Sequence, residues 1–203
     1  HIIQISTDYV FDGTSAPYDE TSRPNPLSYY VKSKLAAENA LAASGAKGTT
    51  VRTQVLYGTG YQVRQNFVAW VLAMFEKAAP FRVVDDQIGN PTLADDLAYA
   101  VLRIAETGTR GLYHVSGPEA VDRLTFAKTI GTVFGFDLGL LSPTTSADIG
   151  QAAGRPMNSS FVTLRFEAEF RHRLSDTERG IKRLLQQYRD GERHADSLLT
   201  AEM

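Results

Sequence analysis

The feature that most restricts the fold of this chain is a regular alternation of short apolar segments with longer segments of helical spacing. Short runs rich in apolar or β-branched residues predict strands over 2–6, 49–56, 81–84 and 111–115. Apolar residues three and four apart predict helices over 26–45, 67–77, 94–107, 124–134 and 176–189. Strands that alternate with helices in this way are typical of an α/β fold with parallel pairing.

The two ends of the chain carry different signals. The chain opens on an apolar strand, Ile2-Ile3-Gln4-Ile5, with neither an initiator Met nor the pattern of a signal peptide. A strand this apolar is expected inside a sheet and covered on both faces, so we expect the chain to be the later part of a larger fold. The Ser-, Thr- and Pro-containing segment 140–160 is expected to be irregular, and 191–203 to be a flexible tail.

Composition excludes several classes of function. The chain has 23 acidic and 21 basic residues and a formal net charge of −2, so we expect no nucleic acid and no membrane as partner. It has no cysteine, which excludes disulfides and a thiol nucleophile. Its four histidines lie far apart in the sequence, and we expect no metal site. No apolar run is long enough for a transmembrane helix, and we expect a cytoplasmic protein.

One group of residues suggests chemistry. Thr7 follows the strand 2–6, and Tyr30 and Lys34 lie four residues apart on one face of the next helix. Because ligands of α/β sheets bind beyond the carboxyl ends of the strands, we expect the three side chains to share a pocket. A free phenol has a pKa of about 10, and a neighbouring ammonium stabilises the phenolate. Such a trio suits the transfer of a proton to a carbonyl oxygen while a hydride reaches the carbon.

Several conspicuous residues also have ordinary structural interpretations. The Tyr–Lys spacing alone is a weak signal, since the chain has 9 tyrosines. Arg52 is expected to pair with an acid, and His114 to be a structural residue within a strand. Trp70 and Phe75 are expected to face a core. The pair Asp85-Asp86 is expected to be solvated rather than to bind a metal.

Ordered motifs over most of the chain point to a family. They are Ser6-Thr7-Asp8-Tyr9-Val10-Phe11-Asp12-Gly13, Tyr30-Val31-Lys32-Ser33-Lys34-Leu35-Ala36-Ala37-Glu38, Val51-Arg52-Thr53, Asn66-Phe67-Val68, Asp86-Gln87-Ile88-Gly89-Asn90-Pro91-Thr92, Gly111-Leu112-Tyr113-His114, Arg155-Pro156-Met157-Asn158-Ser159 and Gly180-Ile181-Lys182. Through these motifs the chain resembles the extended short-chain dehydrogenase/reductases, and within them the dTDP-4-dehydrorhamnose reductases.

The resemblance implies an α/β fold: the C-terminal portion of a Rossmann-like, doubly wound parallel sheet, with a smaller α/β substrate domain. Residues 1–60 would belong to the NAD(P)-binding part, and 61–190 mainly to the substrate domain, with some elements returning to the Rossmann sheet. The implied activity is reduction, by NADPH or NADH, of the 4-keto group of a nucleotide-linked deoxysugar in dTDP-L-rhamnose biosynthesis. The implied partner is a dTDP-linked 4-keto sugar, and a homodimer is compatible with the family.

The resemblance also implies roles for residues. Tyr30 would be the general acid, Lys34 would bind the nicotinamide ribose and tune Tyr30, and Thr7 would be the third catalytic residue. The implied cofactor-binding residues are Ser6, Tyr30, Lys34 and Thr53. The implied substrate-binding residues are Asp8, Val10, Phe11, Val55, Asn66, Phe67, Pro91, Thr92 and Arg155.

Departures from the family pattern leave alternatives open. The related 4,6-dehydratases have Thr-Asp-Glu where this chain has Thr7-Asp8-Tyr9, and the missing Glu argues against dehydration. A sugar-nucleotide epimerase and a non-catalytic NADP-binding regulatory subunit of the same fold remain alternatives. The glycine-rich phosphate loop does not occur in this sequence and is expected before residue 1, so the choice between NADPH and NADH stays open. Val55 stands where such reductases often have Trp, which leaves the exact sugar open.

Overall fold

The computed structural model describes residues 1–60, 65–150 and 154–201. Its central element is a parallel sheet of three strands in the order β1-β2-β7, with bounds Ile2–Thr7, Gly48–Thr53 and Gly111–His114. The register pairs Thr7 with Thr53 and Arg52 with His114, so the carboxyl ends of the strands meet at one edge of the sheet. The parallel α/β arrangement predicted from the alternation is confirmed.

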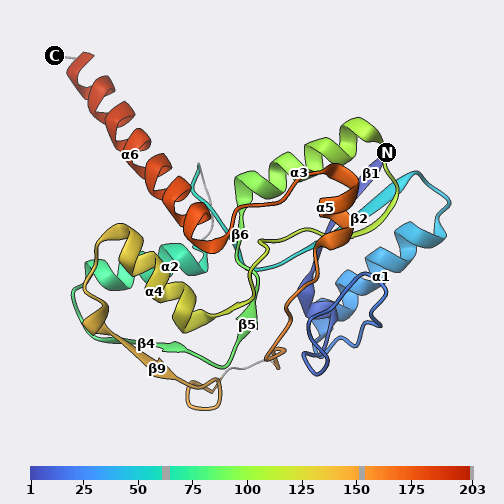
Figure 1. The fold of residues 1–203 in the computed structure, drawn as a ribbon, viewed down its shortest axis with the longest axis horizontal. Coiled ribbons are helices and arrows are strands. Elements are labelled where there is room, and N and C mark those ends of the chain that lie inside the picture. Colours follow the sequence, from blue (N-terminus) through green and yellow to red (C-terminus); the bar gives the residue numbers. More distant parts are fainter. Residues whose placement is uncertain (61–64, 151–153, 202–203) are drawn as a thin grey trace.

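Helices cover both faces of this sheet (Figure 1). The helix α1 (Tyr29–Ala43) connects β1 to β2 on one face, and α3 (Ala94–Thr107) and α5 (Leu164–Phe170) lie on the other. Side-chain alternation along β2 separates the faces, because Val51 joins the apolar cluster of α3 and α5 whereas Arg52 pairs with Glu38 of α1. The pairing of Arg52 with an acid was expected from the sequence.

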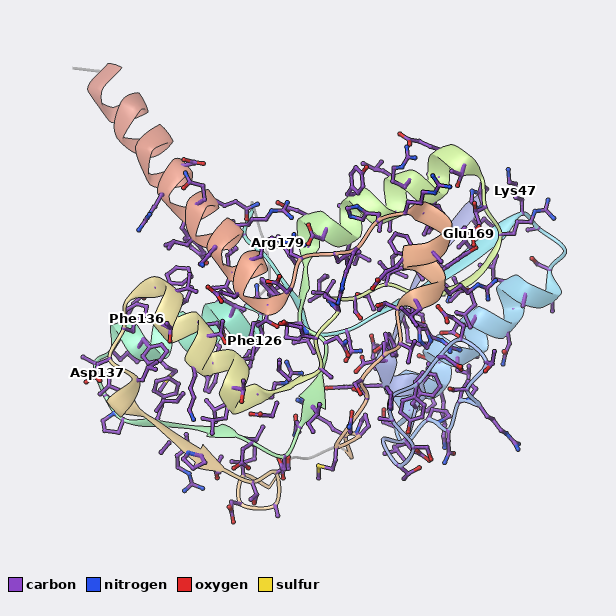
Figure 2. The ribbon with its side chains drawn as sticks, viewed as in Figure 1. Lys47, Phe126, Phe136, Asp137, Glu169 and Arg179 are labelled. Carbon is purple, nitrogen blue, oxygen red and sulfur yellow. The ribbon has the colours of Figure 1, made fainter. Side chains whose placement is uncertain are left out.

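The other elements form a second layer beside this sheet. Its helices are α2 (Phe67–Glu76), α4 (Arg123–Phe134) and α6 (Thr177–Ala201), the last of which leads away from the body of the molecule (Figure 1). The second layer has an aromatic core in which Phe75 stacks on Phe136 with ring centroids 5.1 Å apart; Figure 2 labels Phe126 and Phe136 in this layer. Phe75 is buried and Trp70 packs against the same cluster, as predicted.

Short strands link the two layers. The strand β4 (Phe81–Val84) pairs in parallel with β9 (Leu141–Thr144), and β3 (Leu56–Tyr57) pairs in parallel with β6 (Thr92–Leu93). The strand β5 (Ile88–Gly89) pairs antiparallel with β8 (Val121–Asp122). Two short 3-10 helices, η1 (Asp8–Val10) and η2 (Leu138–Leu140), complete the described elements.

The expectation that the first strand is covered on both faces concerns a larger fold and stays a prediction. Among the described residues, β1 pairs only with β2 and forms an edge of the sheet. At this edge Ile2 is 52% exposed and Ile5 is 39% exposed.

The predicted strand 49–56 is in fact two strands that belong to different sheets. β2 ends at Thr53, and β3 begins at Leu56. Between them Val55 adopts a φ of 45°, which is uncommon for a β-branched residue. The Gln54 side chain holds this break by donating to the Asn90 side chain at 3.3 Å and to the Ser159 carbonyl at 3.2 Å. The segment 49–56 is rich in β-branched residues and has neither Gly nor Pro, so the sequence does not reveal such a turn.

Other differences concern segments expected to be loops. The irregular segment 140–160 contains β9, and the loop 85–92 contains β5 and the start of β6. The helix α5 was not predicted. The last helix continues to Ala201 rather than ending near Arg189, and the rest of the expected flexible tail, 202–203, lies outside the described residues. In contrast, α3 has the predicted bounds.

Candidate active site

The carboxyl ends of β1 and β2 border a cavity of about 390 Å³. Thr7 ends β1, and its hydroxyl caps η1 by accepting a hydrogen bond from the Tyr9 amide at 3.3 Å. Tyr30 lies in the first turn of α1. Thr7 and Tyr30 both line the cavity, so the fold brings together two side chains that are far apart in the sequence.

Lys34 attaches the helix of Tyr30 to the strand of Thr7. Its ammonium donates to the main-chain oxygen of Ile5 at 2.7 Å. Lys34 does not line the cavity, but it lies one helical turn after Tyr30, on the same face of α1. The Tyr30 side chain is 60% exposed, which leaves its phenol accessible to a ligand.

Thr53, a predicted cofactor contact, offers an unused polar atom to the cavity. It lies at the end of β2, is only 7% exposed and lines the cavity wall. Its Oγ1 is one of the buried polar atoms without a hydrogen-bond partner in the described part of the chain. Since buried hydroxyls are normally satisfied, this atom is suited to binding a ligand.

Asp8 is the titratable group most perturbed at the cavity. It is buried, and burial raises its pKa from 3.8 to about 6 against the opposing hydrogen bonds of Ser159 and Thr7. Ser159 Oγ donates to one carboxyl oxygen at 2.5 Å, and Thr7 Oγ1 donates to the other at 3.0 Å. Arg123 provides a nearby positive charge that favours the ionised form. Asp8 therefore borders the cavity, in the region where its substrate contact was predicted.

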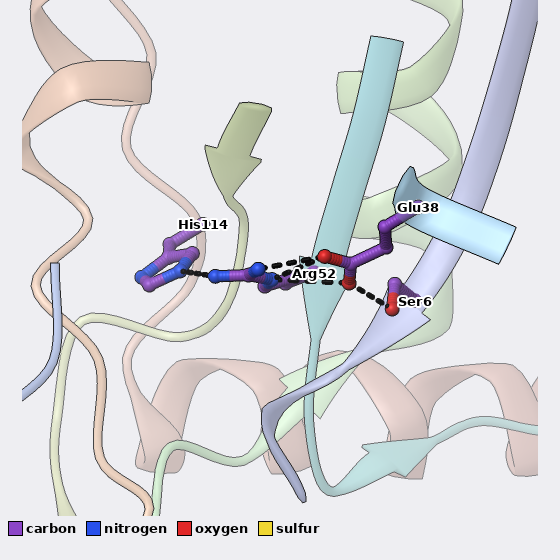
Figure 3. Close-up of polar contacts among 4 residues, drawn as sticks. All are labelled: Ser6, Glu38, Arg52 and His114. Carbon is purple, nitrogen blue, oxygen red and sulfur yellow. Dashed lines mark hydrogen bonds and ion pairs between the residues drawn. The ribbon is translucent and has the colours of Figure 1, made fainter. Parts of the chain in front are cut away.

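A buried polar network adjoins the cavity through Ser6, which also lines it (Figure 3). Ser6 Oγ donates to the Glu38 carboxylate, which is paired with the Arg52 guanidinium at 2.6 Å. Arg52 in turn contacts the ring of His114 at 3.4 Å. His114 is fully buried and stacks on Phe161 with centroids 4.0 Å apart, in keeping with its expected structural role.

A second cavity of about 360 Å³ lies next to the first. The two share Phe67 and Arg123, and the Arg123 guanidinium lies 5.1 Å above the Phe67 ring. Arg82 and Arg155 also line the second cavity, together with the indole of Trp70. Three guanidinium groups beside two aromatic rings suit an anionic group attached to a flat ring.

The structure separates the other predicted substrate contacts into two groups. Val55, Asn66 and Phe67 line the first cavity, and Arg155 lines the second. The Asn66 side chain also caps α2, accepting from the Ala69 amide at 3.0 Å and donating to the Gly58 carbonyl at 3.0 Å.

The remaining four predicted contacts lie away from both cavity walls. Val10 and Phe11 are fully buried in a cluster with Tyr18, onto which Phe11 stacks with centroids 4.1 Å apart. Pro91 and Thr92 are buried, and Thr92 Oγ1 donates to the Asn90 carbonyl at 3.1 Å. These four residues were predicted to contact the substrate. In the structure their side chains face the protein interior, so they shape the loops around the cavities.

Sequence reasoning missed Arg123, which lines both cavities, and Ser159, which binds Asp8. Arg123 follows a two-residue strand at the start of α4, and nothing in its neighbourhood of the sequence distinguishes it from a solvated arginine. Ser159 lies in the motif Arg155-Pro156-Met157-Asn158-Ser159, which was the available signal.

The described residues contain no cluster of three or more His, Cys, Asp or Glu side chains that would hold a metal ion. Asp86 instead accepts from the amide and the hydroxyl of Ser146, each at 2.8 Å. Among the helices of the described ranges, none combines the length and the apolar character needed to cross a bilayer.

Comparison with known proteins gives consistent matches. The family model of the RmlD substrate binding domain matches residues 1–190. The dTDP-4-dehydrorhamnose reductase of Sinorhizobium fredii is 35% identical over 195 residues, covering 91% of this chain and 65% of that protein. The crystal structure of dTDP-4-dehydrorhamnose reductase from Bacillus anthracis in complex with NADP superposes with a TM-score of 0.85 at 32% identity, covering 91% of this chain and 65% of that chain.

A protein of another class also matches. Methionine adenosyltransferase 2 subunit beta of Danio rerio is 31% identical over 172 residues, covering 82% of this chain and 53% of that protein. The chain spans about 65% of the length of the reductases from Sinorhizobium fredii and Bacillus anthracis.

Proposed function

The chain belongs to the RmlD substrate binding domain family, and from this premise we propose that its natural protein is a dTDP-4-dehydrorhamnose reductase. The protein reduces the 4-keto group of a dTDP-linked deoxysugar in dTDP-L-rhamnose biosynthesis. The observation that carries the proposal is the shared cavity of Thr7 and Tyr30, with Lys34 anchored to β1 one turn further along α1.

The residues present fit a nicotinamide cofactor at this cavity. Thr53 contributes a buried hydroxyl without a partner, and Ser6 contributes a second hydroxyl. We propose that Ser6, Tyr30, Lys34 and Thr53 hold the nicotinamide end. When bound, the reduced nicotinamide supplies the hydride that the carbonyl carbon receives. The relative from Bacillus anthracis was solved with NADP, which favours NADPH over NADH.

Residues of this chain bind the carbonyl oxygen and protonate it. The Thr7 hydroxyl donates to Asp8 in this structure, and we propose that it turns to donate to the carbonyl oxygen when the substrate is bound. The Tyr30 phenol donates its proton to the same oxygen, so the product is a secondary alcohol and the phenol becomes a phenolate. The Lys34 ammonium stabilises the phenolate. Tyr9 stands where a dehydratase has its Glu, so the residue that would abstract a proton for dehydration is not a carboxylate.

The two adjoining cavities support a substrate with an anionic end. We propose that the sugar occupies the cavity of Thr7 and Tyr30, and that the diphosphate and base extend past Phe67 into the second cavity. There Arg82, Arg123 and Arg155 suit a diphosphate, since guanidinium groups bind phosphate oxygens through paired N–H donors. The rings of Phe67 and Trp70 suit a stacked pyrimidine. A homodimer and a cytoplasmic location stay predictions.

The second candidate is a non-catalytic NADP-binding subunit, and the match to methionine adenosyltransferase 2 subunit beta favours it. Turnover discriminates the two candidates. The natural full-length protein is mixed with NADPH and a dTDP-linked 4-keto-6-deoxysugar, and the loss of reduced nicotinamide absorbance is followed. Oxidation of NADPH that depends on the sugar nucleotide supports the reductase. If NADPH binds but no 4-keto sugar nucleotide is reduced with NADPH or NADH, the non-catalytic subunit is correct.

A further inference from the structure

Glu38 lies on the inner side of α1, one turn beyond Lys34, and has no role in the reaction described above. Its side chain is 7% exposed. The carboxylate accepts from Ser6 Oγ on β1 and from Arg52 on β2, whose Nε lies 3.1 and 3.2 Å from the two carboxylate oxygens and whose Nη2 lies 2.6 Å from one of them. One carboxylate thus connects the helix of Tyr30 and Lys34 with the two strands whose ends border the cavity (Figure 3).

At the other end of the network, the two neighbours of the His114 ring fix which ring nitrogen carries the proton. His114 Nε2 faces Arg52 Nη1, which can only donate, and His114 Nδ1 lies 3.2 Å from the Tyr18 carbonyl, which can only accept. Both contacts are satisfied when the ring is neutral and carries its proton on Nδ1. Burial and the charge of Arg52 lower the pKa of His114 to about 3, which keeps the ring in this state at neutral pH.

Counting donors and acceptors in the same way shows what Ser6 presents to the cavity. Ser6 has one hydroxyl proton and donates it to Glu38, so it presents only acceptor lone pairs toward the cavity that it lines. Thr7, the next residue, carries the hydroxyl that holds the carbonyl oxygen in the proposed reaction. Two side-chain hydrogen bonds tie this strand end to α1, one from Lys34 to the Ile5 carbonyl and one between Glu38 and Ser6.

We propose that Glu38 is a positioning residue of the reductase site, which through Ser6 and Arg52 holds the end of β1, and with it Thr7, in register with Tyr30 and Lys34. The inference rests on the proposed function. A buried ion pair is a weak source of stability, because the cost of removing both charges from water offsets their attraction. A directional contact between a helix and a strand end is better explained by the need for a defined geometry at the reacting groups.

The experiment compares Glu38→Gln, which keeps the shape and removes the charge, with Ser6→Ala, which removes the hydroxyl that donates to Glu38. The proposed function also places this hydroxyl at the nicotinamide end, so the affinity for NADPH is measured for each variant: a lost cofactor contact weakens it, whereas a lost positioning contact leaves it unchanged. Glu38→Asp is the conservative variant, and Arg183→Met is the control, because Arg183 pairs with Asp96 between α6 and α3 and lines neither cavity. For each full-length variant, kcat and KM are measured together with the unfolding midpoint. Amide hydrogen exchange of β1 and α1 is measured on the same samples.

We expect Glu38→Gln and Ser6→Ala each to lower kcat about tenfold or more and to speed amide exchange at the end of β1 and in the first turns of α1. The double variant is expected to be no worse than the worse single variant, since both act through one contact, and Glu38→Asp is expected to recover part of kcat. Arg183→Met is expected to lower the unfolding midpoint without changing kcat.

If Glu38→Gln and Ser6→Ala lower the midpoint but leave kcat and KM as in the natural protein, the network is purely structural and the proposal is wrong. If Glu38→Gln does not fold, Ser6→Ala decides, because it keeps the Glu38–Arg52 pair. A lower kcat with unchanged affinity for NADPH and faster exchange then supports the positioning role, and a kcat as in the natural protein overturns it. If the natural protein has no turnover, the proposed function fails separately. The exchange data then decide whether Glu38 holds strand and helix together: unchanged exchange in both variants overturns the positioning role.

Discussion

Lys34 reaches back from α1 to the main chain of β1, where its ammonium donates a 2.7 Å hydrogen bond to the carbonyl oxygen of Ile5. Ile5 lies two residues before Thr7, so the lysine of the Tyr–Lys pair is also a direct link to the strand that carries the proposed third catalytic residue. An ammonium has three N–H donors, and this bond uses one of them. The position of Tyr30 relative to Thr7 therefore depends on a contact between elements as well as on helical spacing.

Tyr30→Phe tests the proton donor. Removing the phenol hydroxyl is expected to lower kcat by a factor of about 10²–10⁴, the usual contribution of a general acid, and to leave the affinity for NADPH nearly unchanged. Steady-state kinetics and a fluorescence titration with NADPH measure the two quantities. Tyr29→Phe is the matched control, because Tyr29 precedes Tyr30 and is 88% exposed. Unchanged turnover in Tyr30→Phe would remove the phenol from the mechanism.

Lys34→Met tests the ammonium. Methionine keeps most of the length of the side chain but loses both the charge that stabilises the phenolate and the bond to the Ile5 carbonyl. We expect a fall in kcat of about 10²-fold from the combined electrostatic and geometric loss. The control is Lys32→Met, on an exposed position of the same helix. Equal kinetics of the two variants would contradict the assigned role of Lys34.

Asp8→Asn tests the pH dependence of stability. The pKa of Asp8 is raised from 3.8 to about 6 by burial, so the native state binds the proton more tightly than the unfolded chain. The stability that this protonation contributes is complete below pH 3.8 and is lost as the pH rises through about 6. Asparagine does not titrate in this range. As the pH rises from 3.8 to about 6, the unfolding free energy of Asp8→Asn is therefore expected to rise by about 3 kcal/mol relative to that of the natural protein. Urea unfolding on both sides of the window measures it.

Asp12→Asn is the companion variant, and the expected sign is opposite. Asp12 accepts from the Thr14 amide at 2.9 Å, from the Asn25 side chain at 2.8 Å and from the Thr14 hydroxyl at 2.8 Å, and these bonds hold its pKa below the usual range. Its contribution is present at neutral pH and is lost as the pH falls through the lowered pKa. Asp12→Asn is therefore expected to destabilise at neutral pH, with the difference shrinking in acid. If the unfolding free energy of the two variants, relative to the natural protein, changed with pH in the same direction, these assignments would be refuted.

Gly117→Ala tests a close approach of two backbone segments. A Cβ at Gly117 would lie 2.1 Å from the Pro91 carbonyl oxygen, so the backbone must move to accept it. We expect a loss of unfolding free energy of about 1–3 kcal/mol, as for other overpacked sites. Gly191→Ala is the contrasting variant, because no described atom outside its own helix and its chain neighbours lies within 4 Å of the added Cβ. In the helix α6 that change is expected to stabilise by about 0.5–1 kcal/mol. Chemical denaturation of both variants checks the pair.

Features that depend on neighbours along the chain could be predicted from the sequence. The helix over 94–107 has the predicted bounds, since its apolar spacing is regular and Gly108 after it adopts the left-handed conformation with a φ of 62°. The shared helix face of Tyr30 and Lys34 follows from the geometry of one helical turn. The position of Thr7 at the carboxyl end of a parallel strand follows from the strand–helix alternation.

Other features depend on which surfaces meet in the folded molecule. The break at Val55, the burial of Phe11 and the position of Arg123 at two cavities have no local signal, because each depends on residues far away in the sequence. The sequence by itself determined the strand–helix alternation and the spacing of Tyr30 and Lys34, because helices and strands repeat over a few residues. Only the tertiary structure decided that Glu38 binds Ser6 and Arg52 and that Asp8 binds Ser159, because a buried polar group must find its partner among whatever side chains the packing brings near.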